Sequence, residues 1–183
     1  MSTTLRRRLI SCAASVLIAG ALYSATPAAA TFTPGVGSSV SATTPAATLG
    51  GSFITCAISL HMSVISSGAV GAGGDLQITS GSATNCGFGR SMTMNFSTPW
   101  RLSFVPTSAD ASAMTMTNVD LTVTVFGASC HYRGTLNGTA SDSTDTLSFS
   151  NAGGLILVSG GSACLASPPL DMVLTTGQNI KVD

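Results

Sequence analysis

The chain has 183 residues, of which seven are basic and seven acidic, and all seven acids are aspartate. So sparse and balanced a charge offers no basic surface for a phosphate backbone, which argues against nucleic-acid binding. The missing glutamate and the single lysine also remove residues that usually cover exposed helices, whereas abundant threonine, valine and glycine favour strands and tight turns.

Residues 1–30 have the three parts of a signal peptide. Three arginines at positions 6–8 precede an apolar stretch from about Leu9 to Leu22, and small residues follow up to Ala30. This order predicts export with cleavage after Ala30, by the general secretory route or, through the paired arginines, by the twin-arginine route. We therefore expect a secreted protein or one at the cell surface or envelope.

Residues 31–50 are small and polar and contain two prolines, so we expect a flexible or edge-strand N-terminal segment there. Residues 51–183 are long enough to bury a core and are expected to form a single all-β domain. From Phe53 the sequence alternates with a period of two. This predicts a long, half-buried strand, with one face formed by Ile54, Cys56, Ile58, Leu60, Met62 and Val64.

Shorter alternating segments follow along the rest of the chain, separated by Gly, Ser, Asn and Asp. They begin near Leu76, Met92, Trp100, Met114, Val119, Cys130, Leu147, Leu155, Leu170 and Ile180. The apolar parity reverses between Met116 and Val119, which predicts a β-bulge near Asn118. Asn137-Gly138 is typical of a hairpin turn. About ten short strands without a helical segment predict an all-β fold, either an antiparallel β-sandwich or a small β-barrel.

Four cysteines follow the predicted leader, and an even number in an exported chain predicts two disulfides. They are Cys56, Cys86, Cys130 and Cys164. Four cysteines allow three connectivities. Similar spacings, 30 and 34 residues, favour the pairs Cys56–Cys86 and Cys130–Cys164. The closely paired cysteines typical of zinc sites are absent, and we expect neither a metal nor another cofactor.

No catalytic motif of the common hydrolase, metalloprotease or nucleotide-binding types is present. His61 is five residues from Cys56, and His131 is one residue from Cys130. Residues an odd number apart face opposite sides of a strand, so we expect buried cysteines and solvent-facing imidazoles. The sequence therefore predicts a protein without catalytic residues.

Trp100 is the only tryptophan, and it shares a strand face with Leu102 and Phe104. That face is either part of the core or an apolar ligand-binding face, and the core is the preferred interpretation. The six methionines after the leader leave an apolar ligand open, because methionine adapts to irregular apolar surfaces.

The layout resembles a group of small secreted β-proteins that are common in actinobacteria. The resemblance rests on TPW at 98–100, CHYRGTLNGT at 130–139, TLSFS at 146–150 and the late Cys164. In these features the chain is similar to the family called protein activator of alkane oxidation, over about residues 45–176. The resemblance implies an exported or surface-associated β-domain and brings no catalytic residues with it.

Three classes of function remain, in order of preference. The first is a non-enzymatic structural or interaction protein, secreted or envelope-associated, that contacts hydrophobic surfaces such as envelope lipid. The second is an extracellular binding module with an apolar pocket for a lipid-like or hydrocarbon ligand. The third is an outer-envelope β-barrel or pore, because alternation alone does not distinguish a water-filled lumen from a solvent-facing surface. The sequence does not identify the partner or the oligomeric state.

Overall fold

The computed structural model describes residues 32–67 and 74–182, and within them it contains twelve β-strands and no helix. The signal peptide predicted for residues 1–30 lies outside the described residues. The strands are β1 (Phe32–Thr33), β2 (Ser39–Leu49), β3 (Ile54–Ser66), β4 (Asp75–Thr84), β5 (Arg90–Met94), β6 (Trp100–Ser108), β7 (Ala111–Val125), β8 (Ala128–Ser141), β9 (Thr146–Ala152), β10 (Leu155–Ser159), β11 (Leu170–Thr176) and β12 (Lys181–Val182).

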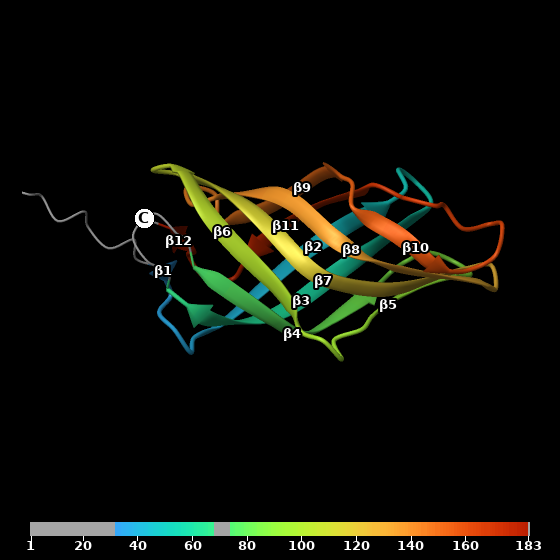
Figure 1. Ribbon diagram of the computed structural model, residues 1–183, viewed down its shortest axis with the longest axis horizontal. Coiled ribbons are helices and arrows are strands. Elements are labelled where there is room, and N and C mark those ends of the chain that lie inside the picture. Colours follow the sequence, from blue (N-terminus) through green and yellow to red (C-terminus); the bar gives the residue numbers. More distant parts are fainter. Residues whose placement is uncertain (1–31, 68–73, 183) are drawn as a thin grey trace, which may run out of the picture.

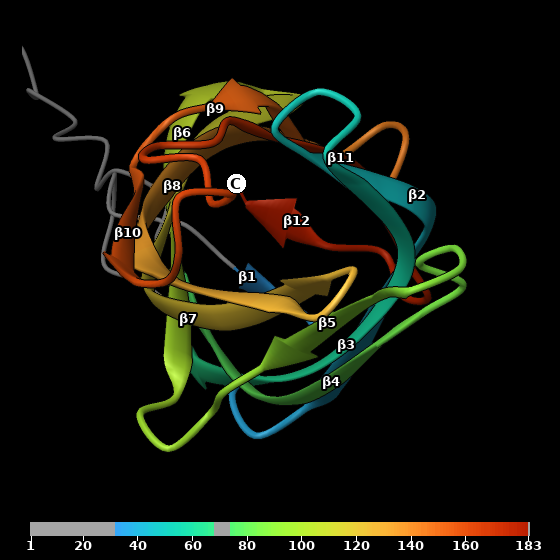
Figure 2. The ribbon, with the colours of Figure 1, turned by 90° about the vertical axis from the view of Figure 1, so that its right-hand side faces the viewer.

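Eight of these strands close into an antiparallel barrel. They pair in the order β8, β9, β11, β2, β3, β4, β6 and β7, and the pairing of β7 with β8 closes the ring (Figure 2). The long strands β7 and β8 extend past their barrel neighbours, and their extensions pair with β5 and β10. The predicted all-β fold of about ten strands is thus confirmed, and it takes the barrel form.

The barrel is filled by the apolar side chains of its inward faces. On β3 the predicted alternation is present, and every second residue from Ile54 to Val64 is buried. An eight-stranded barrel has an interior just wide enough to be filled by side chains. The outward positions carry mostly serine and threonine, so the two faces of the sheet differ sharply in polarity.

The two ends of the barrel differ. At one end lie the β2–β3 and β7–β8 turns and the segments that follow β4 and β10, on the right of Figure 1. Both disulfides are at this end, where Cys56 on β3 bonds Cys86 after β4, and Cys130 on β8 bonds Cys164 after β10. The predicted connectivity is confirmed, and we call this end the disulfide end. The short β1–β12 pair lies at the opposite end.

The structure corrects the expectation of a flexible or edge-strand segment at residues 31–50. Within it, β2 is an interior barrel strand that pairs with β3 on one side and β11 on the other. Its inward residues include Val40, Ala42 and Ala47, and such small side chains give too weak an alternation to reveal a strand. Pro45 lies where the pairing with β3 shifts, a place at which a missing N–H is tolerated. The barrel therefore begins before residue 51.

The hairpin turn predicted at Asn137-Gly138 was also wrong, because β8 runs straight through this dipeptide. Gly138 serves a different purpose. A side chain there would collide with the backbone oxygen of Ser148 on β9 and with the side chain of Phe149. The glycine allows a close approach of the two strands rather than a reversal of the chain.

Candidate functional site

A β-bulge in β7 decides which of its side chains reach the outer surface. The pairing with β8 shifts between Met116 and Val119, and Asn118 within the shift has a φ of 60°. This confirms the bulge predicted near Asn118. Beyond it, Val119 and Leu121 are buried in the core, so the residue between them, Asp120, faces outward.

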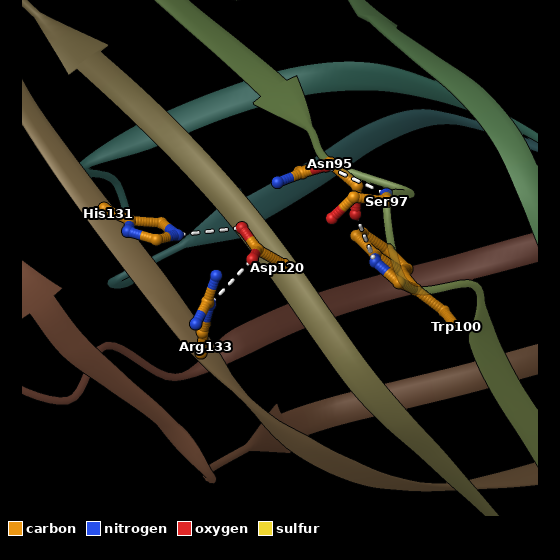
Figure 3. Close-up of polar contacts among 6 residues, drawn as sticks. All are labelled: Asn95, Ser97, Trp100, Asp120, His131 and Arg133. Atoms are coloured by element: carbon orange, nitrogen blue, oxygen red, sulfur yellow. Dashed lines mark hydrogen bonds and ion pairs between the residues drawn. The ribbon is translucent and has the colours of Figure 1, made fainter.

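Asp120 joins His131 and Arg133 of β8 in a hydrogen-bonded cluster (Figure 3). In the β7–β8 register Asp120 lies opposite Arg133, and Thr122 lies opposite His131. Oδ2 of Asp120 accepts a hydrogen bond from Nε of Arg133 at 2.7 Å, and Oδ1 lies 2.8 Å from Nε2 of His131. Each carboxylate oxygen therefore has its own partner. Although Asp120 faces outward, only 8% of it is exposed.

The pKa of Asp120 is lowered from its ordinary value. Burial alone would raise this pKa, but the hydrogen bonds from His131 and Arg133 and the charge of Arg133 outweigh burial. The carboxylate is consequently ionised at neutral pH. It accepts a hydrogen bond from Nε of Arg133, whose side chain stays half-exposed.

The segment between β5 and β6, residues 95–99, is fastened beside this cluster. The backbone N–H of Asn95 donates to the backbone oxygen of Asp120 at 2.9 Å, and Nε1 of Trp100 donates to the backbone oxygen of Asn95 at 2.9 Å. The side chain of Asn95 accepts from the backbone N–H of Ser97 at 3.0 Å. On the opposite side, Nδ2 of Asn118 donates to the backbone oxygen of Pro99. The segment is thereby held in one conformation.

Between this segment and the cluster lies a solvent-open cleft of about 360 Å³ with both polar and apolar lining, which we call the Arg133 cleft. Its walls are formed by Ser97, Thr98, Asn118, Val119, Asp120, Arg133, Gly134 and Thr135. The walls offer hydroxyl groups, an amide and one oriented guanidinium. Such a surface can bind a polar or charged group by hydrogen bonds.

The sequence-predicted residues do not meet at this cleft. Trp100, Leu102 and Phe104 are buried inside the barrel, where the Trp100 ring packs 4.8 Å from that of Phe96 between ring centroids. The four cysteines are in the disulfides at one end. His61 lies exposed on the outer face of β3, as expected, whereas His131 faces outward but keeps only 25% of its side chain exposed beside Asp120.

A second feature is a pair of exposed phenylalanines at the disulfide end. Phe88 lies in the segment after β4 and is 96% exposed, and Phe126 lies in the β7–β8 turn and is 69% exposed. The two loops touch, because the backbone N–H of Phe126 donates to the backbone oxygen of Gly89 at 2.7 Å. The guanidinium of Arg90 lies 5.5 Å from the centroid of the Phe126 ring. We call Phe88 and Phe126 the apolar tips.

Sequence reasoning missed the Asp120 cluster and the apolar tips for different reasons. The cluster depends on a strand register that the sequence does not show. The tips do carry a signal, since Phe88 lies between Gly87 and Gly89 and Phe126 precedes Gly127. Glycines mark turns, and turns run over the protein surface, so a phenylalanine beside them is expected to be exposed.

In the part of the chain that the structure describes, no three or more histidine, cysteine or acidic side chains are grouped closely enough to hold a metal ion. The same residues include no helix of the length and apolarity that a membrane span requires.

Comparison with known proteins identifies one family. The model of the alkane oxidation protein activator PraA/PraB-like family matches residues 5–181. This confirms the resemblance seen in the sequence and extends it beyond residues 45–176. No curated protein and no solved structure matches the chain.

Proposed function

Because the chain belongs to the PraA/PraB-like family of alkane oxidation activators, we propose that it is an exported, non-enzymatic interaction protein whose disulfide end contacts apolar surfaces. The family description names an activator, which suggests a role beside a reaction rather than in its chemistry. The observation that carries the proposal is the exposure of Phe88 and Phe126 on two touching loops.

The apolar tips are suited to this contact by their chemistry and by their rigidity. Clustered exposed apolar side chains are typical of surfaces that bind a protein, a membrane or another apolar phase. Full burial of a phenylalanine contributes about 1.5–3 kcal/mol, so two tips would give a weak, reversible attachment. The Cys56–Cys86 bridge fixes one end of the segment that carries Phe88, which reduces the entropy lost on binding.

Two features support export. The N-terminal thirty residues follow the pattern of a signal peptide. The barrel also carries two disulfides, which form and persist in oxidising compartments outside the cytosol. An exported protein with apolar tips would meet envelope lipid or external hydrocarbon directly.

The interior of the barrel favours surface contact over an internal ligand pocket. An apolar space in the interior, lined by residues that include Trp100, Met92, Met116 and Met172, measures only about 20 Å³. Ligand pockets usually measure about 300–1,000 Å³. A hydrocarbon chain would therefore have to displace much of the core.

The polarity of the barrel favours a water-facing outer surface over a pore. Transmembrane barrels place apolar side chains on the outside and polar ones in the lumen. Here the inward side chains are apolar, and most outward positions on strands such as β3 and β7 carry serine, threonine or histidine.

The direct test is adsorption of the purified, disulfide-bonded protein to hexadecane droplets, measured as the protein depleted from the aqueous phase. The comparison is with the F88S/F126S double variant, which we expect to remain in water.

A further inference from the structure

We propose that the Arg133 cleft is a binding site for a ligand that carries a single carboxylate group. The proposal is independent of the apolar tips, because the cleft lies on the outer face of β7 and β8 and contains neither Phe88 nor Phe126. It rests on the orientation of Arg133, on the local charge and on the rigidity of the cleft walls.

Arg133 is presented to the cleft with its direction fixed. Its Nε donates to Oδ2 of Asp120, an acceptor that is itself almost fully buried and ionised. This bond holds the plane of the guanidinium, while the side chain stays half-exposed and lines the cleft. The two terminal amino groups of a guanidinium match the two oxygens of a carboxylate, and a fixed guanidinium loses little entropy when it binds one.

The local charge selects a monoanion. Arg133 contributes one positive charge and Asp120 one negative charge, and His131 adds a further positive charge only when it is protonated. A phosphate dianion would bring two negative charges close to the Asp120 carboxylate, where like charges repel. A carboxylate brings only one, so the Asp120 carboxylate repels it less than it repels a phosphate dianion.

The cleft walls complete the site. Ser97, Thr98 and Thr135 supply hydroxyl groups that can donate to a ligand oxygen. The segment that carries Ser97 and Thr98 is held by the bonds of Asn95 to Asp120 and of Trp100 to Asn95. The cleft is open to solvent and large enough, at about 360 Å³, for a small organic acid.

The test is a ¹⁵N–¹H NMR titration of the intact, disulfide-bonded protein with sodium butyrate at constant ionic strength, alongside its uncharged counterpart butanamide. We expect saturable shifts of the Arg133 Nε–H and of the Ser97 and Thr98 amides with butyrate and none with butanamide. Inorganic phosphate should bind more weakly than butyrate. N-acetylalanine, used in a parallel titration, represents a peptide carboxyl terminus, whereas butyrate represents a fatty-acid headgroup. The tighter binder of the two indicates the natural source of the carboxylate.

Two variants with the same change in net charge provide the control. R133Q removes the guanidinium from the cleft and should weaken butyrate binding by about tenfold or more. R101Q removes an exposed guanidinium that pairs with Asp75 outside the cleft, and it should bind like the parent. Equal binding of butanamide, tighter binding of phosphate, or unchanged affinity in a folded R133Q protein would overturn the proposal.

Discussion

Asp120 on β7 lies directly opposite Arg133 on β8, and its carboxylate accepts a 2.7 Å hydrogen bond from the Arg133 Nε while its other oxygen meets His131. Its backbone oxygen accepts a third bond, from the N–H of Asn95. One residue thus joins two neighbouring strands and the segment that leads into β6. The closing seam of the barrel and one wall of the Arg133 cleft depend on the same side chain.

Replacement of this carboxylate should destabilise the barrel. In D120N the shape is kept, but the charge is lost and one buried oxygen becomes a donor that faces Arg133 or His131. We expect the free energy of unfolding to fall by about 1–3 kcal/mol, measured by urea denaturation at neutral pH. D75N is the matched control, because Asp75 makes only a 3.7 Å contact to the exposed Arg101. D75N should lower the free energy of unfolding by no more than about 1 kcal/mol. Equal losses in the two variants would contradict the special role of Asp120.

The lowered pKa of Asp120 predicts how this contribution depends on pH. Because the folded-state pKa lies below the unfolded value, the stabilisation is fully present above the unfolded value of about 3.9 and is lost as the pH falls toward the folded-state pKa. The stability difference between the parent and D120N should therefore be constant from about pH 7 to pH 5 and shrink below about pH 4. Urea denaturation at pH 7, 5 and 3 measures it. A difference that does not change across this range would show that the charge of Asp120 is not the cause.

The two disulfides should each contribute substantially to stability. They close loops of 30 and 34 residues, for which the chain-entropy account gives about 3–4 kcal/mol each. The C56A/C86A and C130A/C164A variants should each show a lower midpoint of thermal unfolding by circular dichroism. The parent protein under reducing conditions should fall below both. If reduction left the midpoint unchanged, the bridges would not stabilise the barrel.

Gly134 should not tolerate a side chain, because a Cβ there would collide with the backbone of Gly154 at the β8–β10 pairing. We expect G134A to lower the free energy of unfolding by about 1–3 kcal/mol, as overpacking does. Gly161 provides the matched control, since a Cβ at that position meets nothing within 4 Å. G161A should be close to neutral in the same urea denaturation experiment. If G134A left the free energy of unfolding unchanged, the close packing of β10 against β8 would be contradicted.

The parts of the fold that could be predicted are those that local alternation encodes. The alternation from Ile54 to Val64 predicted β3, and the parity change near Asn118 predicted the bulge. The similar cysteine spacings led to the right disulfides. The choice of barrel over sandwich could not be made, because closure depends on β7 pairing with both β6 and β8. β2 was not predicted, because its small inward residues give too weak an alternation.

The candidate site was harder to predict from the sequence than the fold was. Asp120 and Arg133 are thirteen residues apart, and they meet only because the β7–β8 hairpin brings them into register beyond a bulge. A change of one residue in register would place either side chain on the other face. For the same reason, the prediction that His131 faces solvent did not include its contact with Asp120.

The central claim is that the apolar tips attach the protein to apolar surfaces, and adsorption to hexadecane droplets tests it most directly. The parent should be depleted from water, and F88S/F126S should lower its adsorption by about tenfold or more. V36S/V105S is the control, because Val36, between β1 and β2, and Val105, on β6, are 60% and 56% exposed and lie outside the two loops that carry the apolar tips. It should adsorb like the parent. A parent that stays in water, or equal losses in the two double variants, would contradict the account.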